Sequence, residues 1–344
     1  SKKNKNLKAV DFFCSIGGVS LGYKQAGVEV LGGIDIDESC KETYERNINA
    51  KFLLEDVSKL NFPKVGNFFE IKRKQDNVVF VGCSPCQYYS NIKTDKTKSV
   101  STRLLLSDFQ EFVDYFKPGY VFIENVPGLD KKPESPLGEF KAFLKKKGYA
   151  FDEGVINAKH YGVPQNRRRF VLLASRIKSV KLPKGNKDYI STVREAIGDT
   201  NKFRVINAGQ KDNSSFMHSS ARLSPKNLER IRLTPHDGGD RRAWKNNKEV
   251  QVSCYFEHEG HYDVYGRMHW DKPSPTITTR FVSYSNGRYG HPEQDRAISL
   301  REGATLQSFP EDFVFYSKSQ GQVAKMIGNA VPPKLAKNIA LSIL

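Results

Sequence analysis

The sequence predicts an α/β fold, with a doubly wound, mostly parallel sheet and a second, smaller, irregular domain. Short apolar runs rich in β-branched residues, such as Val78 to Val81, alternate with segments of helical spacing, a pattern typical of parallel sheets. A glycine-containing turn, Cys14 to Gly18, follows the first apolar run of the chain, Lys8 to Phe13. Sheets of this kind bind nucleotide-like ligands at such a turn. The stretch from Lys178 to Glu293 is polar, glycine-rich and basic, which indicates a separate domain of loops.

The first three predicted strands end in residues suited to a nucleotide-like ligand. Lys8 to Phe13 is the first strand, and a helix begins after the turn at about Val19, so its N-terminus faces the ligand. Val28 to Ile34 is the second strand, and Asp35 stands at its end, where a carboxylate holds ribose hydroxyls. Asp56 follows the third strand in the same manner.

The fourth predicted strand leads into Cys83-Ser84-Pro85-Cys86. Three interpretations of these cysteines are open. They form a redox pair, or Cys86 is a nucleophile and Cys83 has no chemical role, or both cysteines are structural. A redox motif usually opens a helix directly, whereas the polar loop Tyr88 to Thr102 follows here. Pro85 also stiffens the approach to Cys86. The pattern therefore favours Cys86 as a lone nucleophile.

A carboxylate ends the next predicted strand. The segment from Leu104 to Phe116 has helical spacing, and the strand Gly119 to Ile123 after it ends at Glu124. Parallel strands bring their carboxyl ends to one edge, so Glu124 is expected beside Cys86. A structural salt bridge is the alternative, which we disfavour because no charge lies near Glu124 in the sequence.

Positive charge is the strongest compositional signal. The 344 residues include 55 Lys and Arg against 38 Asp and Glu, a net charge of +17, which indicates a polyanionic partner such as nucleic acid. One basic cluster enters a predicted strand, Phe170 to Ala174, and alternation there points Arg167 and Arg169 to one side and Arg168 to the other. An ordinary basic surface is the alternative to a functional cluster.

Several protein classes are disfavoured by what the sequence lacks. It contains no signal-peptide pattern, no long apolar run and no His and Cys grouping with zinc spacing. Its five cysteines lack framework spacing, which is typical of a reducing compartment. We therefore expect a cytoplasmic protein that is neither secreted nor membrane-spanning and needs no metal or redox cofactor.

Six motifs follow one another along the chain: DFFCSIGG (11–18), Pro85-Cys86-Gln87, Glu124-Asn125-Val126, Gln165-x-Arg167-x-Arg169, RAISLREGATLQSFP (296–310) and a closing Gly328-Asn329. In this order they resemble the motifs of the DNA cytosine-C5 methyltransferases, over nearly the whole chain. The resemblance implies a catalytic, cofactor-binding domain formed by residues 1–177 and 311–344. It also implies a target-recognition domain with its hinge over residues 178–310, and DNA in the cleft between the two domains.

The resemblance implies the reaction as well: a methyl group passes from S-adenosylmethionine to C5 of a cytosine flipped out of a specific duplex DNA sequence. Cys86 would add covalently to C6 of the base, and Glu124 would supply or share the proton at N3. Arg169 would hold the cytosine O2, and Arg167 would fix the base, the thiolate or a phosphate. The base that removes the C5 proton is expected to be a water.

The cofactor-binding residues implied by the resemblance lie in the turn, at strand ends and near the C-terminus: Phe13, Cys14, Gly17, Gly18, Asp35, Ile36, Asp56, Val57, Pro85, Asn329 and Ala330. Expected DNA-binding residues are Gln87, Ser90, Arg103, Arg241, Arg242, Thr276 and Arg280. We further expect a monomer of prokaryotic or phage origin that is associated with the nucleoid. It would be the modification enzyme of a restriction–modification system, with a separate cognate endonuclease as a candidate partner.

Three positions depart from the pattern of the family. Ser15 stands where glycine is usual, Asp35-Ile36 where glutamate and a bulky residue are usual, and Tyr89 where phenylalanine is usual. None of these changes removes a group that the chemistry needs. The alternatives are an RNA cytosine-C5 methyltransferase acting on tRNA, a catalytically inactive DNA-binding relative, and a disulfide oxidoreductase that would also need Cys83. The long basic second domain favours duplex DNA over tRNA.

Overall fold

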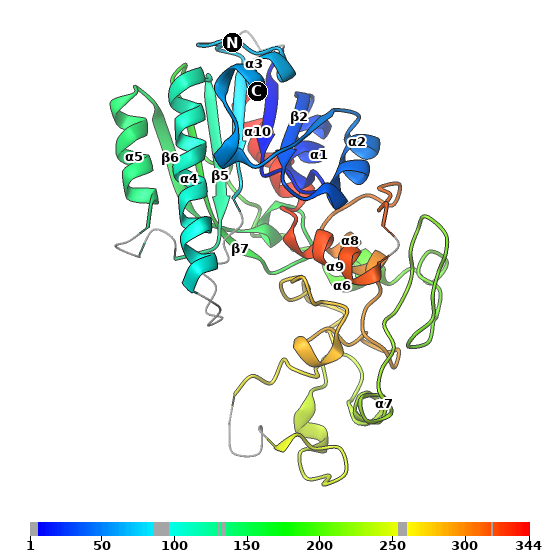
Figure 1. Ribbon diagram of the computed structural model, residues 1–344. Helices are drawn as coiled ribbons and strands as arrows, with labels where there is room; N and C mark the ends of the chain where they lie inside the picture. Colours follow the sequence, from blue (N-terminus) through cyan, green and yellow to red (C-terminus); the bar gives the residue numbers. More distant parts are fainter. Residues whose placement is uncertain (1–5, 85–95, 129–130, 132–134, 254–259, 318) are drawn as a thin grey trace. The chain divides into compact units, whose positions relative to one another are not determined.

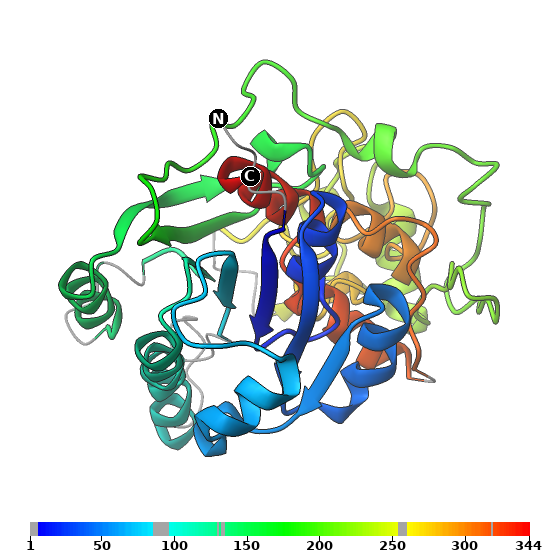
Figure 2. The ribbon, with the colours of Figure 1, turned by 90° about the horizontal axis from the view of Figure 1, so that it is seen from above.

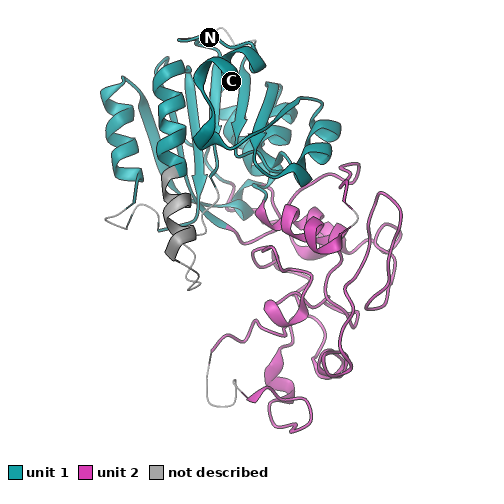
Figure 3. Ribbon diagram, in the orientation of Figure 1, with its two compact units in different colours: residues 1–161, 168–185, 330–344 teal, residues 162–167, 186–329 magenta. Residues whose placement is uncertain are grey.

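The computed structural model describes residues 6–84, 96–128, 131, 135–253, 260–317 and 319–344, with only the backbone for 96–104. The chain forms two compact units (Figure 3). Unit 1 consists of residues 1–161, 168–185 and 330–344, and unit 2 of residues 162–167 and 186–329. The chain therefore passes between the units four times, and the C-terminal residues return to unit 1.

Unit 1 is built on a seven-stranded sheet in the order β3-β2-β1-β4-β5-β7-β6. The strands are β1 (Lys8–Phe12), β2 (Glu29–Asp35), β3 (Lys51–Leu54), β4 (Val78–Gly82), β5 (Tyr120–Asn125), β6 (Ala150–Asn157) and β7 (Arg168–Ser175). The first five pair in parallel, whereas β7 is antiparallel to both β5 and β6. This mostly parallel sheet confirms the predicted fold class.

Helices cover both faces of the sheet (Figures 1 and 2). One face packs against α3 (Phe62–Phe69), α4 (Lys96–Phe116) and α5 (Leu137–Lys146), and the other against α1 (Gly18–Gln25) and α10 (Pro333–Ile343). Burial on both faces explains why β4 is apolar at every position, VVFVG, instead of alternating. A further helix, α2 (Lys41–Ile48), follows β2, and short 3-10 helices lie at Glu38–Cys40, Val57–Lys59 and Ala158–Tyr161.

The C-terminal helix α10 completes the core of unit 1. Its Ile339 is fully buried in the same cluster as Val79 of β4 and Val19 of α1. The backbones of α1 and α10 approach so closely that a Cβ atom at Gly22 would lie 2.3 Å from the Pro333 carbonyl oxygen. Glycine at that position of α1 is therefore required by packing, although glycine disfavours helix.

Unit 2 has little regular secondary structure. Its helices are α6 (Val193–Ile197), α7 (Pro225–Leu233), α8 (Leu300–Leu306) and α9 (Gln320–Asn329), with 3-10 turns at Arg241–Trp244 and Tyr284–Asn286. Many of its backbone carbonyls therefore lack the hydrogen bonds of a helix or sheet. Buried arginines bind these carbonyls instead, because a guanidinium offers five donors. Arg267 donates to the carbonyls of Ile231, Thr234, His291 and Gln294, and Arg301 to those of Ser215, Phe216, Pro310 and Phe313.

These internal arginines change the interpretation of the net charge. Arg267, Arg296 and Arg301 are completely buried, so part of the positive charge of unit 2 is structural and is not available to a polyanion. The charge excess alone therefore overstates the basic surface. Three buried guanidinium groups are tolerated because their N–H donors bind carbonyl oxygens or carboxylates.

All six predicted strands are present, and their bounds differ from prediction by at most two residues. Sequence reasoning missed β6 and α5, because β6, AFDEGVIN, contains only short apolar runs at the edge of the sheet. The unit boundaries also differ from the predicted ones: unit 2 begins at 186 and continues to 329, and it takes residues 162–167. None of the described helices is long and apolar enough to span a membrane.

Candidate functional site

The turn after β1 is shaped by backbone geometry. Phe13, Ser15 and Gly17 all have positive φ angles, of 59°, 48° and 91°. The Ser15 N–H donates to Asp35 Oδ2 over 2.8 Å, which ties the turn to the end of β2. A Cβ atom at Gly18 would lie 2.1 Å from the Val331 carbonyl oxygen, so this glycine is required by packing within unit 1.

The ends of β2 and β3 place the predicted ribose and adenine residues at one edge of the sheet. Asp35 accepts from the N–H groups of Ser15 and Asp37, and burial raises its pKa against the effect of these bonds. A carboxylate has about four acceptor positions, so Asp35 keeps acceptor capacity for a hydroxyl group beside its backbone N–H partners. Ile36 beside it is 70% exposed, which is unusual for a large apolar side chain and suits contact with a planar base.

The two other predicted adenine contacts lie after β3. Asp56 caps the turn at Val57–Lys59, accepting from the N–H and hydroxyl of Ser58, so one of its oxygens is engaged. Val57 is buried, and Phe13 is partly buried against the core of unit 1. Cys14 is buried as well, and burial raises the pKa of its thiol well above the usual range. This edge therefore combines apolar contacts, acceptors and the N-terminus of α1, which together fit an adenosine-containing ligand.

Glu124 and Arg169 meet at the ends of β5 and β7. Arg169 Nε lies 3.0 Å from Glu124 Oε1, and Glu124 is 8% exposed. The antiparallel register pairs Asn125 with Phe170, which brings Arg169 next to the end of β5. The expectation that Glu124 forms no salt bridge was therefore wrong, because the partner comes from a strand more than forty residues away. Asn125 Oδ1 accepts from the Val126 N–H and so shapes the turn after Glu124.

Cys83 lies beside this ion pair in an environment that keeps its thiol protonated. Burial, with the nearby carboxyl groups of Glu124 and Asp11, raises the pKa of Cys83 well above its usual value. A thiolate is the reactive form of cysteine, so Cys83 is poorly suited to nucleophilic or redox chemistry. The predicted nucleophile Cys86 and its neighbours Pro85, Gln87 and Ser90 lie outside the described residues. Arg103 lies within α4, and its side chain is likewise outside the description.

Arg167 lies in unit 2, buried in a polar network. Its Nη1 donates to the Ile277 carbonyl over 2.9 Å and its Nη2 to the Gly328 carbonyl over 3.2 Å. Gln165 accepts from the Ile277 N–H and donates to Gln307, which extends the network to α8. Through these bonds Arg167 holds backbone segments of unit 2 together. Its expected contact with the base, the thiolate or a phosphate stays a prediction, and these hydrogen bonds do not support it.

The predicted DNA-reading residues of unit 2 differ in accessibility. Arg241 is buried and donates to the Gly260 carbonyl over 2.6 Å, an internal role in place of the expected base contact. Arg242 is bonded twice to Asp240 and lies 4.6 Å from the centre of the Tyr262 ring. Thr276 donates to the Asn166 carbonyl. Arg280 is exposed and, within the described residues, forms no ion pair, which leaves it the best placed of the four.

The two cofactor-binding residues expected near the C-terminus lie on either side of a unit boundary. Asn329 is the exposed last residue of α9 in unit 2, and Ala330 is buried in unit 1.

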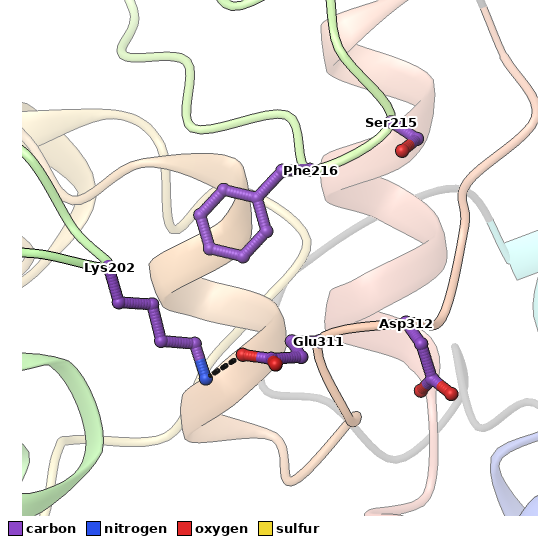
Figure 4. Close-up of a pocket in the computed structure, with 5 residues that line it drawn as sticks. All are labelled: Lys202, Ser215, Phe216, Glu311 and Asp312. Atoms are coloured by element: carbon purple, nitrogen blue, oxygen red, sulfur yellow. Dashed lines mark ion pairs between the residues drawn. The ribbon is translucent and has the colours of Figure 1, made fainter.

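Unit 2 also has an open surface pocket of about 370 Å³ lined by Lys202, Ser215, Phe216, Glu311 and Asp312 (Figure 4). Lys202 and Glu311 form an ion pair across it. The pocket contains none of the predicted site residues.

Sequence reasoning missed the internal structural role of the arginines and glutamines that organise unit 2, because their residue types are typical of surfaces. Gln165, Arg167, Arg296, Arg301 and Gln307 lie inside the motifs from Gln165 to Arg169 and from Arg296 to Pro310, whereas Arg267 lies outside every motif. The sequence contains no feature that marks an arginine as buried. Among the described residues no group of His, Cys, Asp and Glu side chains could hold a metal ion.

Comparison with known proteins places the chain among methyltransferases. The family model described as C-5 cytosine-specific DNA methylase matches residues 7–344. The Type II methylase M.HgiDII of Herpetosiphon aurantiacus is 37% identical, over 97% of this chain and 94% of the relative. The Type II methyltransferase M1.BsuMI of Bacillus subtilis is 32% identical, over 98% and 80%. A prophage-encoded protein from E. coli, described as a DNA modification methyltransferase, has the same fold, with a TM-score of 0.73 at 22% identity over 98% of both chains.

Proposed function

The chain belongs to the C-5 cytosine-specific DNA methylase family, and from that premise we propose that it methylates C5 of a cytosine flipped out of a specific duplex DNA sequence, with S-adenosylmethionine as donor. The observation that carries the proposal is the Glu124–Arg169 pair, which lies at the same sheet edge as the end of β4, the strand that precedes Pro85 and Cys86 in the sequence. A carboxyl group, a guanidinium and a cysteine are the groups this chemistry requires.

The residues of unit 1 fit S-adenosylmethionine. Asp35 keeps acceptor capacity for a ribose hydroxyl, Ile36 presents an exposed apolar surface for the adenine, and the N-terminus of α1 after the turn favours a carboxylate. When bound, the cofactor supplies an electrophilic methyl group on a sulfonium. The task of the protein is then to make C5 of cytosine nucleophilic.

Cys86 would perform that activation by adding as a thiolate to C6 of the flipped base, forming a covalent Cys86–C6 bond. Negative charge then moves toward N3, where Glu124 shares or delivers its proton. Arg169 binds Glu124 through Oε1, so the carboxylate that remains after proton transfer is stabilised by an adjacent positive charge. The guanidinium of Arg169 would also bind the cytosine O2. After methylation a base removes the C5 proton and Cys86 leaves.

The paired cysteines allow a direct test. Methyl transfer is measured as tritium incorporation from labelled S-adenosylmethionine into duplex DNA and, separately, into tRNA. We expect Cys86→Ala to abolish transfer into DNA and the matched Cys83→Ala to keep most of it, because the Cys83 thiol stays protonated. Equal loss in both folded variants would refute the lone nucleophile. Incorporation into tRNA alone would favour the RNA methyltransferase.

We also propose that the enzyme is the modification component of a restriction–modification system, since the relatives named above are Type II methylases. Such an enzyme must methylate one sequence completely to protect the DNA of its cell. Bisulfite sequencing of DNA from cells that express it should show a single sequence context methylated at nearly every occurrence. Scattered methylation without a shared context would contradict this part of the proposal. A separate cognate endonuclease remains the candidate partner.

A further inference from the structure

Asp11 is a buried acid directly beneath the candidate cofactor turn. It lies on β1 between Gly33 of β2 and Val81 of β4, and it is 2% exposed. Its side chain points to the α1 face, where the Ser20 hydroxyl donates to Asp11 Oδ2 over 2.6 Å. The Tyr44 hydroxyl lies 2.8 Å from that of Ser20, so a hydrogen-bonded chain links β1, α1 and α2.

Among the described residues, no positive charge pairs with this acid. The groups that face it from the surrounding elements are Cys14 in the turn, Asp35 on β2, Cys83 after β4, Tyr23 on α1 and Tyr44 on α2. None of the ion pairs in the described part of the chain includes Asp11, and its Oδ1 has no hydrogen-bond partner there. The Tyr23 hydroxyl nearby also lacks one. Burial, reinforced by Asp35 and opposed by the bond from Ser20, raises the pKa of Asp11 to about 7.

We propose that Asp11 is a positioning residue that holds a proton in the free protein and releases it when S-adenosylmethionine binds. The inference rests on the proposed function, because it takes the turn at Cys14 to Gly18 as the cofactor site. S-adenosylmethionine carries a sulfonium and an ammonium against one carboxylate, so its binding adds positive charge beside a turn that begins three residues after Asp11. Positive charge near a carboxyl group favours its ionised form.

The sign of the pH dependence follows from linkage. Because the bound state holds fewer protons than the free state, the affinity for S-adenosylmethionine rises with pH and levels off above the pKa of free Asp11, about 7. Below that pH the affinity should fall by up to about tenfold per pH unit. S-adenosylhomocysteine lacks the sulfonium charge, so its affinity should depend less on pH.

The test is calorimetric titration of the full chain with S-adenosylmethionine at about pH 6.5, in two buffers of different ionisation enthalpy, which counts the protons released. We expect the wild type to release a substantial fraction of one proton, less with S-adenosylhomocysteine, and Asp11→Asn to release none. Ser20→Ala keeps the carboxyl group but removes the bond that favours its ionised form, so the midpoint of the affinity profile should move to higher pH.

Two results would overturn the proposal: cofactor binding by the wild type without proton release, and proton release that persists in Asp11→Asn. If Asp11→Asn does not fold, an unchanged midpoint in Ser20→Ala overturns it as well. Failure of the wild type to bind S-adenosylmethionine at all would instead refute the proposed function, and this inference with it. Binding without proton release leaves the proposed function intact, so the two failures are distinguishable.

Discussion

Replacement of Glu302 by glutamine should destabilise unit 2 strongly. Glu302 and Arg296 are both completely buried, and two bonds of 2.8 Å join them. Glu302 also accepts from the Ser299 N–H over 2.6 Å, which closes a capping box at the start of α8. Glutamine keeps the shape of the side chain but removes its charge, so Arg296 is left buried without a counterion.

The magnitude can be obtained in two ways. Burial alone would raise the pKa of Glu302, but Arg296, with a smaller effect of His291, lowers it to about 2. A pKa that is lowered from 4.5 to about 2 in the folded protein corresponds to about 3 kcal/mol of stability at neutral pH. Breaking a buried ion pair by removal of one partner typically costs about 3–5 kcal/mol. The two figures agree, so we expect Glu302→Gln to lose about 3 kcal/mol or more.

The assay is urea unfolding followed by tryptophan fluorescence. The chain has two tryptophans, Trp244 and Trp270, and both lie in unit 2, so the signal reports this unit. Glu311→Gln is the matched control, because Glu311 pairs with Lys202 at an exposed site, where such pairs contribute under about 1 kcal/mol. If Glu302→Gln costs no more than Glu311→Gln, the buried pair does not stabilise unit 2 and the reasoning is refuted.

The same buried cluster predicts a pH dependence. The pKa of His291 is lowered to about 3, mainly by burial, and that of Glu302 to about 2. Both groups bind protons more readily in the unfolded chain, so the stability of unit 2 is largest at neutral pH. It should begin to fall below about pH 6.5, where unfolded histidine becomes protonated, and fall further below about pH 4.5. Tryptophan-detected unfolding across this range measures it. Stability that is constant from neutral pH down to about pH 4.5 would contradict the assignment for His291, and stability that does not fall between about pH 4.5 and pH 2 would contradict that for Glu302.

Three further variants test the candidate sites. Asp35→Ala should weaken S-adenosylmethionine binding measured by calorimetry, since each charge-assisted hydrogen bond contributes about 1.5–3 kcal/mol, while DNA binding stays the same; unchanged cofactor affinity would place the ribose elsewhere. Arg169→Ala should lower kcat by about 100-fold or more with little effect on cofactor affinity, and a loss confined to cofactor affinity would contradict its role beside Glu124. Arg280→Ala should relax sequence preference in methylation of cognate and variant duplexes, whereas the Asp240-paired Arg242→Ala should not; equal weakening on all DNA would mean that Arg280 contacts phosphate only.

The sheet of unit 1 could be predicted largely from local patterns. Apolar runs bounded by glycine located β1, β2, β4 and β5 within one or two residues, because a strand buried on both faces needs consecutive apolar side chains. The position of Asp35 at the end of β2 was also predictable, since parallel strands present their carboxyl ends at one edge. Edge strand β6 was missed because its burial is partial and its residues are mixed.

What the sequence alone determined is therefore the order of the strands along the chain, the turn, the acids at the strand ends and the family to which the motifs point. Tertiary structure decided which charged groups meet. Arg169 meets Glu124 only because β7 pairs antiparallel with β5, and within the described residues the elements around Asp11 supply it with no ion-pair partner. The spacing of apolar residues follows the period of a strand or helix, and this spacing can be seen directly in the sequence. The partner of a buried charge depends on the register of distant segments, and whether an arginine such as Arg267 binds DNA or its own backbone is settled only when the chain has folded around it.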